Sequence, residues 1–160
     1  MTNIMRYVRW CAISAIVIFL CVVALGEARS QTIFVVHKDF GGPILQRLKQ
    51  LESMRNMRGL NIEIRGVCYS ACTMFLFLPR DRVCVGRGAR LGFHSAIDTR
   101  TNQVTPESVK VTKILVRKYP TWVRSWILRA GGLEKEVKVM PYHYASRFMR
   151  VCGGVSGKNG

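Results

Sequence analysis

Acidic residues are scarce in this chain. Nine Asp or Glu stand against 25 Lys or Arg, which gives a formal net charge of +16 over 160 residues. A charge of this size is typical of proteins that bind nucleic acid. The basic residues are scattered rather than gathered in one run, so we expect no nucleic-acid partner. They predict a basic solvated surface, with attraction to an anionic membrane or cell-envelope polymer as the alternative.

The chain also lacks internal repeats and any linker of the kind that separates domains. Its length suits a single domain. Apolar residues make up 49% of the sequence, which argues against a disordered chain. We therefore expect one globular domain with a packed core.

Long hydrophobic runs are absent except near the N-terminus, at residues 10–26. A basic stretch precedes this run and small residues follow it, which is the layout of a secretory signal peptide cleaved after Gly26 or Ala28. The alternative is an uncleaved anchor associated with the membrane through residues 10–26, because the run is at the short end of a membrane span.

Either interpretation places the rest of the chain outside the cytoplasm. We predict a periplasmic protein, or one anchored to the inner membrane and facing the periplasm. The chain then divides into a signal peptide or membrane anchor at 1–28, a folded domain at 30–152 and a flexible tail at 153–160.

Cysteines are few but even in number once the two in the leader are set aside. Four remain: Cys68, Cys72, Cys84 and Cys152. In an oxidising compartment they predict two disulfides, with three connectivities open. Cys68 and Cys72 are so near in sequence that we expect their partners to be Cys84 and Cys152. No second close cysteine pair exists, so we expect no metal site.

The first half of the domain has the pattern of a strand–helix–strand unit. Residues 32–37 form a β-branched and aromatic run, and residues 44–58 carry apolar side chains at helical spacing. Residues 60–65 then alternate apolar and polar side chains. A unit of this length predicts a crossover connection between two parallel strands.

The elements that follow are shorter. We predict a tight turn at 66–70, a wholly buried helix at 71–78, and strands at 82–86 and 91–94. Two helices follow, beginning at Thr105 and at Thr121 and ending before Pro120 and before Gly131-Gly132.

Ser70 follows a predicted parallel strand and begins a buried helix. Ligand sites in open α/β sheets lie at the carboxyl ends of strands. Gly41 and Gly42 follow the first strand, where glycine lets a backbone N–H approach a ligand closely. His94 ends a later strand, at the same edge of the sheet. A serine, free amides and a base are the components of an acyl-transfer site.

Three segments together resemble the Clp-protease and crotonase superfamily, and specifically its Clp-type serine peptidase branch. They are "DFGG" before a helix, "IRGVCYSACT", and "RVCVGRGARLGFHSA". The pattern is most similar to small exported members that combine a Cys-x-Ser-Ala-Cys segment with a Leu-Gly-Phe-His segment. The resemblance covers residues 32–132. It implies a ClpP/crotonase-like repeated β-β-α spiral with mostly parallel strands.

The resemblance also implies the role of each residue. Ser70 would be the nucleophile and His94 the general base, and the amides of Gly41 or Gly42 and of Ala71 would form the oxyanion hole. The substrate would be a peptide or protein. Domains of this type usually assemble, so the resemblance implies a homo-oligomer. No cofactor is expected.

The aspartate that orients the histidine in Clp-type peptidases has no match here. At a comparable distance the chain has His143. Four acids follow His94, namely Asp98, Glu107, Glu134 and Glu136, and none is placed convincingly. The alternatives are a Ser–His dyad, a backbone carbonyl on the histidine, or a serine–lysine pair with Lys110 or Lys113. A missing acid lowers the rate by about 10⁴ where it sets the tautomer.

Other interpretations remain open for the same residues. Ser70 is also a preferred helix cap, His94 could be a core histidine, and Cys68 or Cys72 could replace serine as the nucleophile. A non-catalytic module that binds a peptide or a cell-envelope component is the alternative function. Acyl-thioester chemistry is disfavoured, because an exported protein would not meet a coenzyme-bound substrate.

Overall fold

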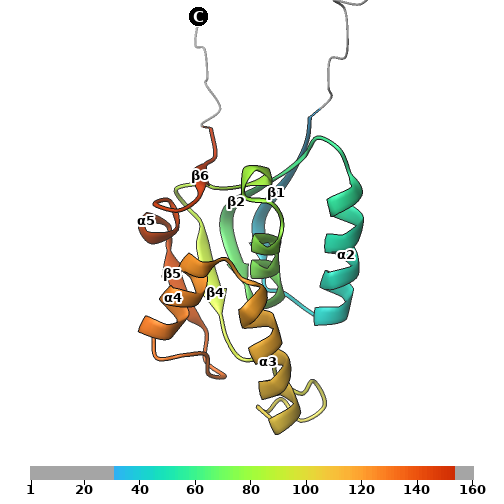
Figure 1. Ribbon diagram of the computed structural model, residues 1–160, viewed down its shortest axis with the longest axis vertical. Coiled ribbons are helices and arrows are strands. Elements are labelled where there is room, and N and C mark those ends of the chain that lie inside the picture. The colour runs from blue at the N-terminus through green and yellow to red at the C-terminus, as the bar shows by residue number, and fades with distance from the viewer. Residues whose placement is uncertain (1–30, 154–160) are drawn as a thin grey trace, which may run out of the picture. The chain divides into compact units, whose positions relative to one another are not determined.

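The computed structural model describes residues 31–153, which form one mixed α/β domain (Figure 1). The predicted leader at 1–28, in either of its two interpretations, lies outside the described residues, as does nearly all of the predicted tail. Among the helices of the described part, none is long and apolar enough to span a membrane.

The domain contains six strands, four α-helices and two 3₁₀ helices. The strands are β1 (Thr32–Asp39), β2 (Leu60–Tyr69), β3 (Val83–Val85), β4 (Arg90–Phe93), β5 (Lys138–Pro141) and β6 (Arg150–Val151). The α-helices are α2 (Ile44–Asn56), α3 (Pro106–Lys118), α4 (Thr121–Arg129) and α5 (Tyr142–Ala145). The 3₁₀ helices are η1 (Ser70–Phe77) and η2 (Arg80–Arg82).

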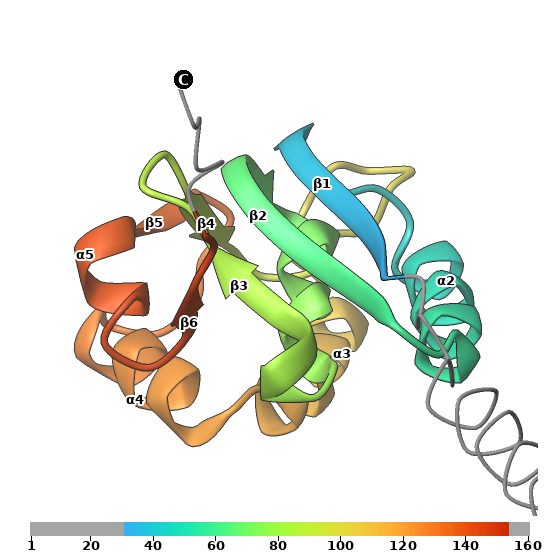
Figure 2. The same ribbon diagram turned by 90° about the horizontal axis from the view of Figure 1, so that it is seen from above.

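Strand β2 is the centre of a curled, mostly parallel sheet (Figure 2). It pairs in parallel with β1 along one side. On its other side it pairs first with β3, through Ile62–Ile64, and then with β4, through 67–69. The strand order is β5-β4-β2-β3-β6, with β1 paired to β2 outside this series. Among these strand pairs, only β4–β5 is antiparallel. The predicted crossover from β1 through α2 to β2 is confirmed.

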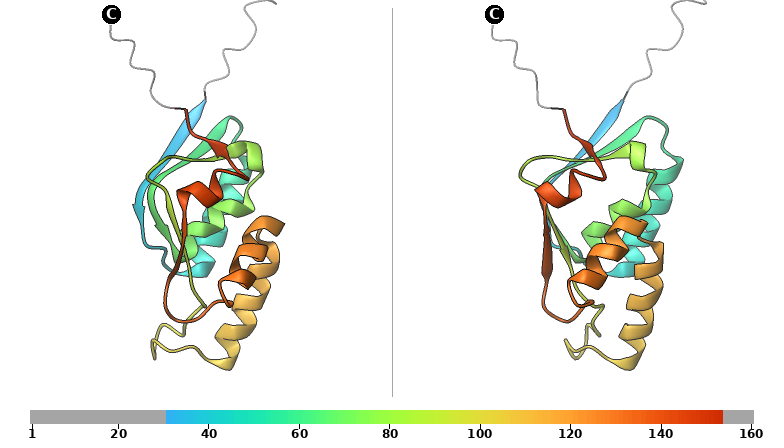
Figure 3. Two further views of the ribbon diagram at one scale, coloured as in Figure 1. Left: turned by 90° about the vertical axis from the view of Figure 1, so that its left-hand side faces the viewer. Right: turned by 60° about the vertical axis from the view of Figure 1, so that its left-hand side comes forward.

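The helices gather on one face of the sheet (Figure 3). The core lies between them and the strands. Its fully buried side chains include Ile62, Ile64, Phe75, Phe93 and Val123. Burial of such side chains supplies the main driving force for folding. The core therefore fixes the ends of β2 and β4, which carry Ser70 and His94.

One local prediction beside Ser70 is wrong, and another, the buried helix at 71–78, is confirmed except for the type of helix and a shift of one residue. The segment expected as a tight turn at 66–70 continues β2 as far as Tyr69. Gly66 lies beside a register shift between β1 and β2, and a Cβ at this position would collide with the His37 carbonyl. Glycine here thus permits close backbone approach rather than a turn. The buried helix that follows is a 3₁₀ helix and includes Ser70.

The later helices agree with their sequence signals. Thr105 caps α3 by accepting from Ser108 N–H, and the Ser108 hydroxyl accepts from Thr105 N–H, so the two form a reciprocal capping box. Pro106 occupies the first turn. Helix α4 ends just before Gly131-Gly132, as the sequence predicts.

The predicted disulfide pairing is wrong, although all four cysteines are bridged. Cys68 pairs with Cys72, and Cys84 pairs with Cys152. The near pair can close because β2 runs straight into the turn at Ser70, which brings the two Cα atoms to 5.2 Å. Two disulfides indicate an oxidising, exported environment.

Candidate active site

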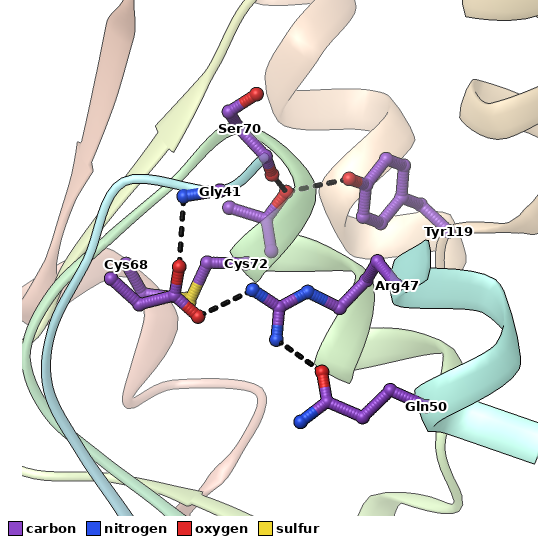
Figure 4. Close-up of a disulfide and its surroundings, with 9 residues drawn as sticks. Gly41, Arg47, Gln50, Cys68, Ser70, Cys72 and Tyr119 are labelled. Carbon is purple, nitrogen blue, oxygen red and sulfur yellow. Dashed lines mark hydrogen bonds and ion pairs between the residues drawn. A yellow bond between two sulfur atoms is a disulfide. The ribbon is translucent and has the colours of Figure 1, made fainter. Parts of the chain in front are cut away.

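Ser70 lies at the junction between β2 and η1, with φ of 55°. Positive φ is uncommon for a residue with a side chain and costs about 1–2 kcal/mol. A serine held in such a strand-to-helix turn presents its Oγ clear of the backbone, which is the geometry of a nucleophile elbow. Ser70 is half-buried, and its side chain points away from the neighbouring disulfide (Figure 4).

Gly41 packs directly against this turn. A Cβ at Gly41 would lie 2.6 Å from Ser70 Cβ and 2.7 Å from Ala71 N. Its φ of 98° is also in the region that favours glycine. The space in front of the Ala71 amide is therefore open only because residue 41 has no side chain.

A partly buried ion pair holds the Gly41 loop. Asp39 accepts from the Gly41 N–H at 2.8 Å through Oδ1 and pairs with Arg47 at 2.6 Å through Oδ2 (Figure 4). Arg47 is only 9% exposed, donates to Gln50 and stacks over the Phe75 ring at 4.8 Å. This pair was not predicted from the sequence. The available signal was an aspartate two residues before a glycine that follows a strand.

The amides predicted for the oxyanion hole therefore differ in whether a side chain already accepts their N–H. The Gly41 N–H is occupied by Asp39. The N–H groups of Gly42 and Ala71 make no side-chain hydrogen bond within residues 31–153, and Ala71 lies in the first turn of η1, where N–H groups lack helical partners. Gly42 is exposed and lines a neighbouring hollow with Arg47 and Gln50.

His94 directly follows β4 and is half-buried. Its Nδ1 lies 2.6 Å from the Ser95 carbonyl oxygen. A carbonyl oxygen can only accept, so Nδ1 carries the proton and Nε2 is left as the basic nitrogen. This arrangement is the backbone-carbonyl alternative for orienting the histidine.

The segment after His94 is tied down by three hydrogen bonds. Ser95 donates its N–H to the Glu134 carbonyl at 2.6 Å and its hydroxyl to the Leu133 carbonyl at 2.9 Å. Ala96 donates its N–H to the Thr112 hydroxyl at 2.8 Å. The carbonyl that accepts from His94 is thus fixed by α3 and by the loop after α4.

Ser70, Ala71 and His94 line one small pocket, whose enclosed space is about 40 Å³. The other walls are largely apolar side chains, including Ile44, Met74, Phe93, Leu115, Val116 and Leu133. His94 is the only basic side chain in this lining, which contains no carboxylate.

A chain of two hydroxyls supports the backbone of Ser70 from beneath. Thr73 donates to the Ser70 carbonyl at 2.7 Å, and its hydroxyl oxygen is 2.6 Å from the Tyr119 hydroxyl (Figure 4). Because Thr73 has one proton and gives it to Ser70, Tyr119 donates to Thr73. Burial raises the pKa of Tyr119 well above its usual value, so this donor stays protonated.

The described residues place no carboxylate on His94. Asp98 accepts from Arg100 and Thr101 within its own loop. Glu134 pairs with Lys138, while Glu107 and Glu136 are exposed.

The other residues considered as bases or nucleophiles are either outside the pocket or bonded in disulfides. Lys110 and Lys113 are exposed on α3 and do not line the pocket, and His37 and His143 are also exposed. All four cysteines are in disulfides, so neither Cys68 nor Cys72 is available as a nucleophile. No cluster of three or more potential metal ligands occurs within residues 31–153.

No protein-family model matches the chain, and no curated protein matches it either.

Proposed function

We propose that the chain is an exported serine hydrolase that cleaves peptide bonds, with Ser70 as nucleophile and His94 as general base. One observation carries the proposal. A serine at positive φ, on a strand-to-helix turn, shares a pocket with a histidine whose Nδ1 is fixed on a carbonyl. Unusual backbone geometry is enriched at functional sites, and a simple helix cap does not require it.

The chemistry follows from the tautomer of His94. Nε2 accepts the Ser70 hydroxyl proton as Oγ attacks the carbonyl carbon of the peptide. The oxyanion that forms is stabilised by the N–H groups of Ala71 and Gly42. The imidazolium then gives its proton to the leaving amine, and a water molecule repeats the sequence on the acyl-serine. Throughout, Nδ1–H remains on the Ser95 carbonyl.

No hydrogen bond joins the Ser70 and His94 side chains within residues 31–153. Such bonds are often long before substrate binds and tighten only in the reacting complex. A neutral carbonyl stabilises an imidazolium less than a carboxylate does. We therefore expect a slow hydrolase.

The fold supports the superfamily resemblance as part of this proposal. In this proposal the parallel unit of β1, α2 and β2 corresponds to the first turn of a ClpP/crotonase-like spiral, and the strand that precedes His94 pairs with the carboxyl end of β2. Within residues 31–153, the helices lie on one face of the sheet and none covers the opposite face (Figure 3). That face is compatible with a homo-oligomer.

A specific observation favours the alternative of a non-catalytic module. The Gly41 amide is already occupied by Asp39, and His94 has no carboxylate partner. Under this alternative the pocket binds an apolar segment of a peptide or a cell-envelope component without cleaving it.

Labelling with a fluorophosphonate probe distinguishes the serine hydrolase from the non-catalytic binding module. We expect the folded, oxidised full-length protein to be labelled, and Ser70→Ala and His94→Ala to abolish labelling. Ser146→Ala and His143→Ala are matched controls, because both residues lie in the α5 segment outside the pocket. A folded wild-type protein that is not labelled would overturn the role of Ser70 as a nucleophile and favour the binding module.

A further inference from the structure

The Cys68–Cys72 disulfide encloses Ser70 in a very short ring. The two cysteines are four residues apart, and Ser70 is the middle residue of the five. Cys68 belongs to the end of β2, and Cys72 belongs to the first turn of η1. The bridge therefore joins the two elements whose junction sets the direction of the Ser70 side chain (Figure 4).

On its strand side the bridge is anchored between the other parts of the site. Cys68 pairs with Asp39 of β1 and with Leu91 of β4. Asp39 leads directly into the Gly41 loop, and β4 leads directly to His94. The strand end that holds the bridge is thus fixed relative to both the amide loop and the base.

On its helix side the bridge opposes a relaxation of the turn. Ser70 has φ of 55°, a conformation that a serine leaves readily when nothing holds it. The only hydrogen bond that the Ser70 backbone carbonyl receives from a side chain within residues 31–153 is from Thr73, which belongs to the same helix as Cys72. A covalent link across the junction restricts this turn more tightly than one hydrogen bond does.

Two other roles fit the bridge less well. Both cysteines are 0% exposed, so a reductant cannot reach the sulfur atoms in the folded state, which disfavours a redox switch. The ring is short, and a disulfide constrains the unfolded chain less as the loop that it closes becomes shorter. The bridge is therefore expected to stabilise the fold less than a bridge that closes a long loop.

We infer that the Cys68–Cys72 disulfide is a positioning device, which holds Ser70 in its positive-φ turn toward the pocket shared with His94. This inference rests on the proposed hydrolase function. The bridge itself takes no part in bond making, and its cysteines are positioning residues.

The second disulfide provides a matched control. We compare Cys68→Ala/Cys72→Ala with Cys84→Ala/Cys152→Ala, each as the full-length chain, by the second-order rate of fluorophosphonate labelling below the melting transition. Removing the Cys68–Cys72 bridge should slow labelling by roughly 10- to 100-fold, because a small misplacement of a reacting atom has effects of this size. The pH at which labelling is half-maximal should not move, because His94 keeps its Ser95 partner. Removing the Cys84–Cys152 bridge should leave the rate unchanged.

A backbone measurement tests the inference separately from the proposed function. The N–H to Hα distance within Ser70, measured by NMR from the nuclear Overhauser effect, is short at positive φ and should be short in the wild type but not in Cys68→Ala/Cys72→Ala. If the wild type is never labelled, the hydrolase proposal fails while this measurement still tests the clamp. An unchanged labelling rate, or unchanged positive φ, in the variant would overturn the inference.

Loss of folding has its own control. Cys68→Ser/Cys72→Ser keeps nearly the same side-chain volume without the bond. If both double variants fail to unfold cooperatively, the bridge is required for folding and the positioning role is overturned.

Discussion

The two disulfides of this domain join very different parts of the chain. Cys84–Cys152 links residues 68 positions apart and fastens the short strand β6 to β3. Cys68–Cys72 links residues four positions apart and lies at the turn that carries Ser70. Both are buried. They differ in what they restrict: one closes most of the domain, and the other fixes a single junction.

The entropy of loop closure allows the stabilisation by each disulfide to be estimated. In the loop-closure account, a bridge that closes a loop of nearly 70 residues stabilises the fold by about 4 kcal/mol, and one that closes five residues by about 2 kcal/mol. The short bridge thus contributes less to stability although it lies closest to the candidate nucleophile. Bridges in one small protein can therefore serve the fold and the site separately.

The largest effect should come from the long bridge. Cys84→Ala/Cys152→Ala should lower the free energy of unfolding by about 4 kcal/mol, because the unfolded chain gains the freedom of the long loop. Urea unfolding followed by circular dichroism measures this loss. Cys68→Ala/Cys72→Ala is the comparison, with an expected loss of about 2 kcal/mol. Equal losses would show that loop length does not control the two contributions.

Gly41→Ala should affect the site more than the fold. The new Cβ would lie 2.6 Å from Ser70 Cβ and 2.7 Å from Ala71 N, and it would occupy the space where an oxyanion is stabilised. Loss of one oxyanion donor lowers the rate by about 10²–10³. We expect labelling to fall by at least that factor.

Gly131→Ala is the matched control for this substitution, because Gly131 also has positive φ and its added Cβ would meet only Lys138 Nζ within residues 31–153, at 3.7 Å. The backbone penalty is therefore common to the two variants, and Gly131 does not line the pocket. If both variants lost labelling equally, backbone strain rather than occupation of the oxyanion space would be the cause.

Thr73→Val should test the hydroxyl chain beneath Ser70. It removes the bond to the Ser70 carbonyl and leaves the buried Tyr119 hydroxyl without its acceptor. A lost hydrogen bond of this kind costs about 1 kcal/mol, and an orphaned buried hydroxyl about 1–3 kcal/mol. In Thr73→Val/Tyr119→Phe the orphaned hydroxyl is removed as well, so the double variant should be more stable than Thr73→Val. Thermal unfolding of the two variants measures the difference, and the opposite order would contradict this account.

Sequence periodicity predicted most of the architecture. The crossover from β1 to β2 and the capped helix α3 were predicted because their signals are local: alternation, helical spacing and a Thr-Pro cap. Ser70, Ala71 and His94 were grouped because the carboxyl ends of parallel strands meet at one edge. The structure places these three residues in one pocket.

What the sequence did not reveal depends on conformation or on distant packing. The pairing of Cys68 with Cys72 depends on a positive φ at Ser70, which no composition rule indicates for serine. The contact between Thr73 and Tyr119 joins residues 46 positions apart and forms only when α3 docks on η1. The Asp39–Arg47 pair, which occupies the Gly41 amide, likewise requires α2 to pack against Phe75.

The smallest effect should come from Asp98, whose turn is held by hydrogen bonds and one ion pair with Arg100 rather than by a covalent bridge. Its carboxylate accepts from the Arg100 N–H and then from the Arg100 side chain, which lowers the pKa of Asp98 below its usual value. The pKa of Asp98 is therefore lower in the folded protein than in the unfolded chain. Asp98 stabilises the folded protein above its unfolded-state pKa, and this stabilisation is lost as the pH falls through its folded-state pKa. An NMR pH titration should therefore give a midpoint below about 3.9, the reference value for aspartate.

Asp98→Asn should leave both the rate and the pH profile of Ser70 labelling unchanged, because this carboxylate is engaged within its own loop. A shifted profile would mean that Asp98 reaches His94 during the reaction, and would supply the missing acid.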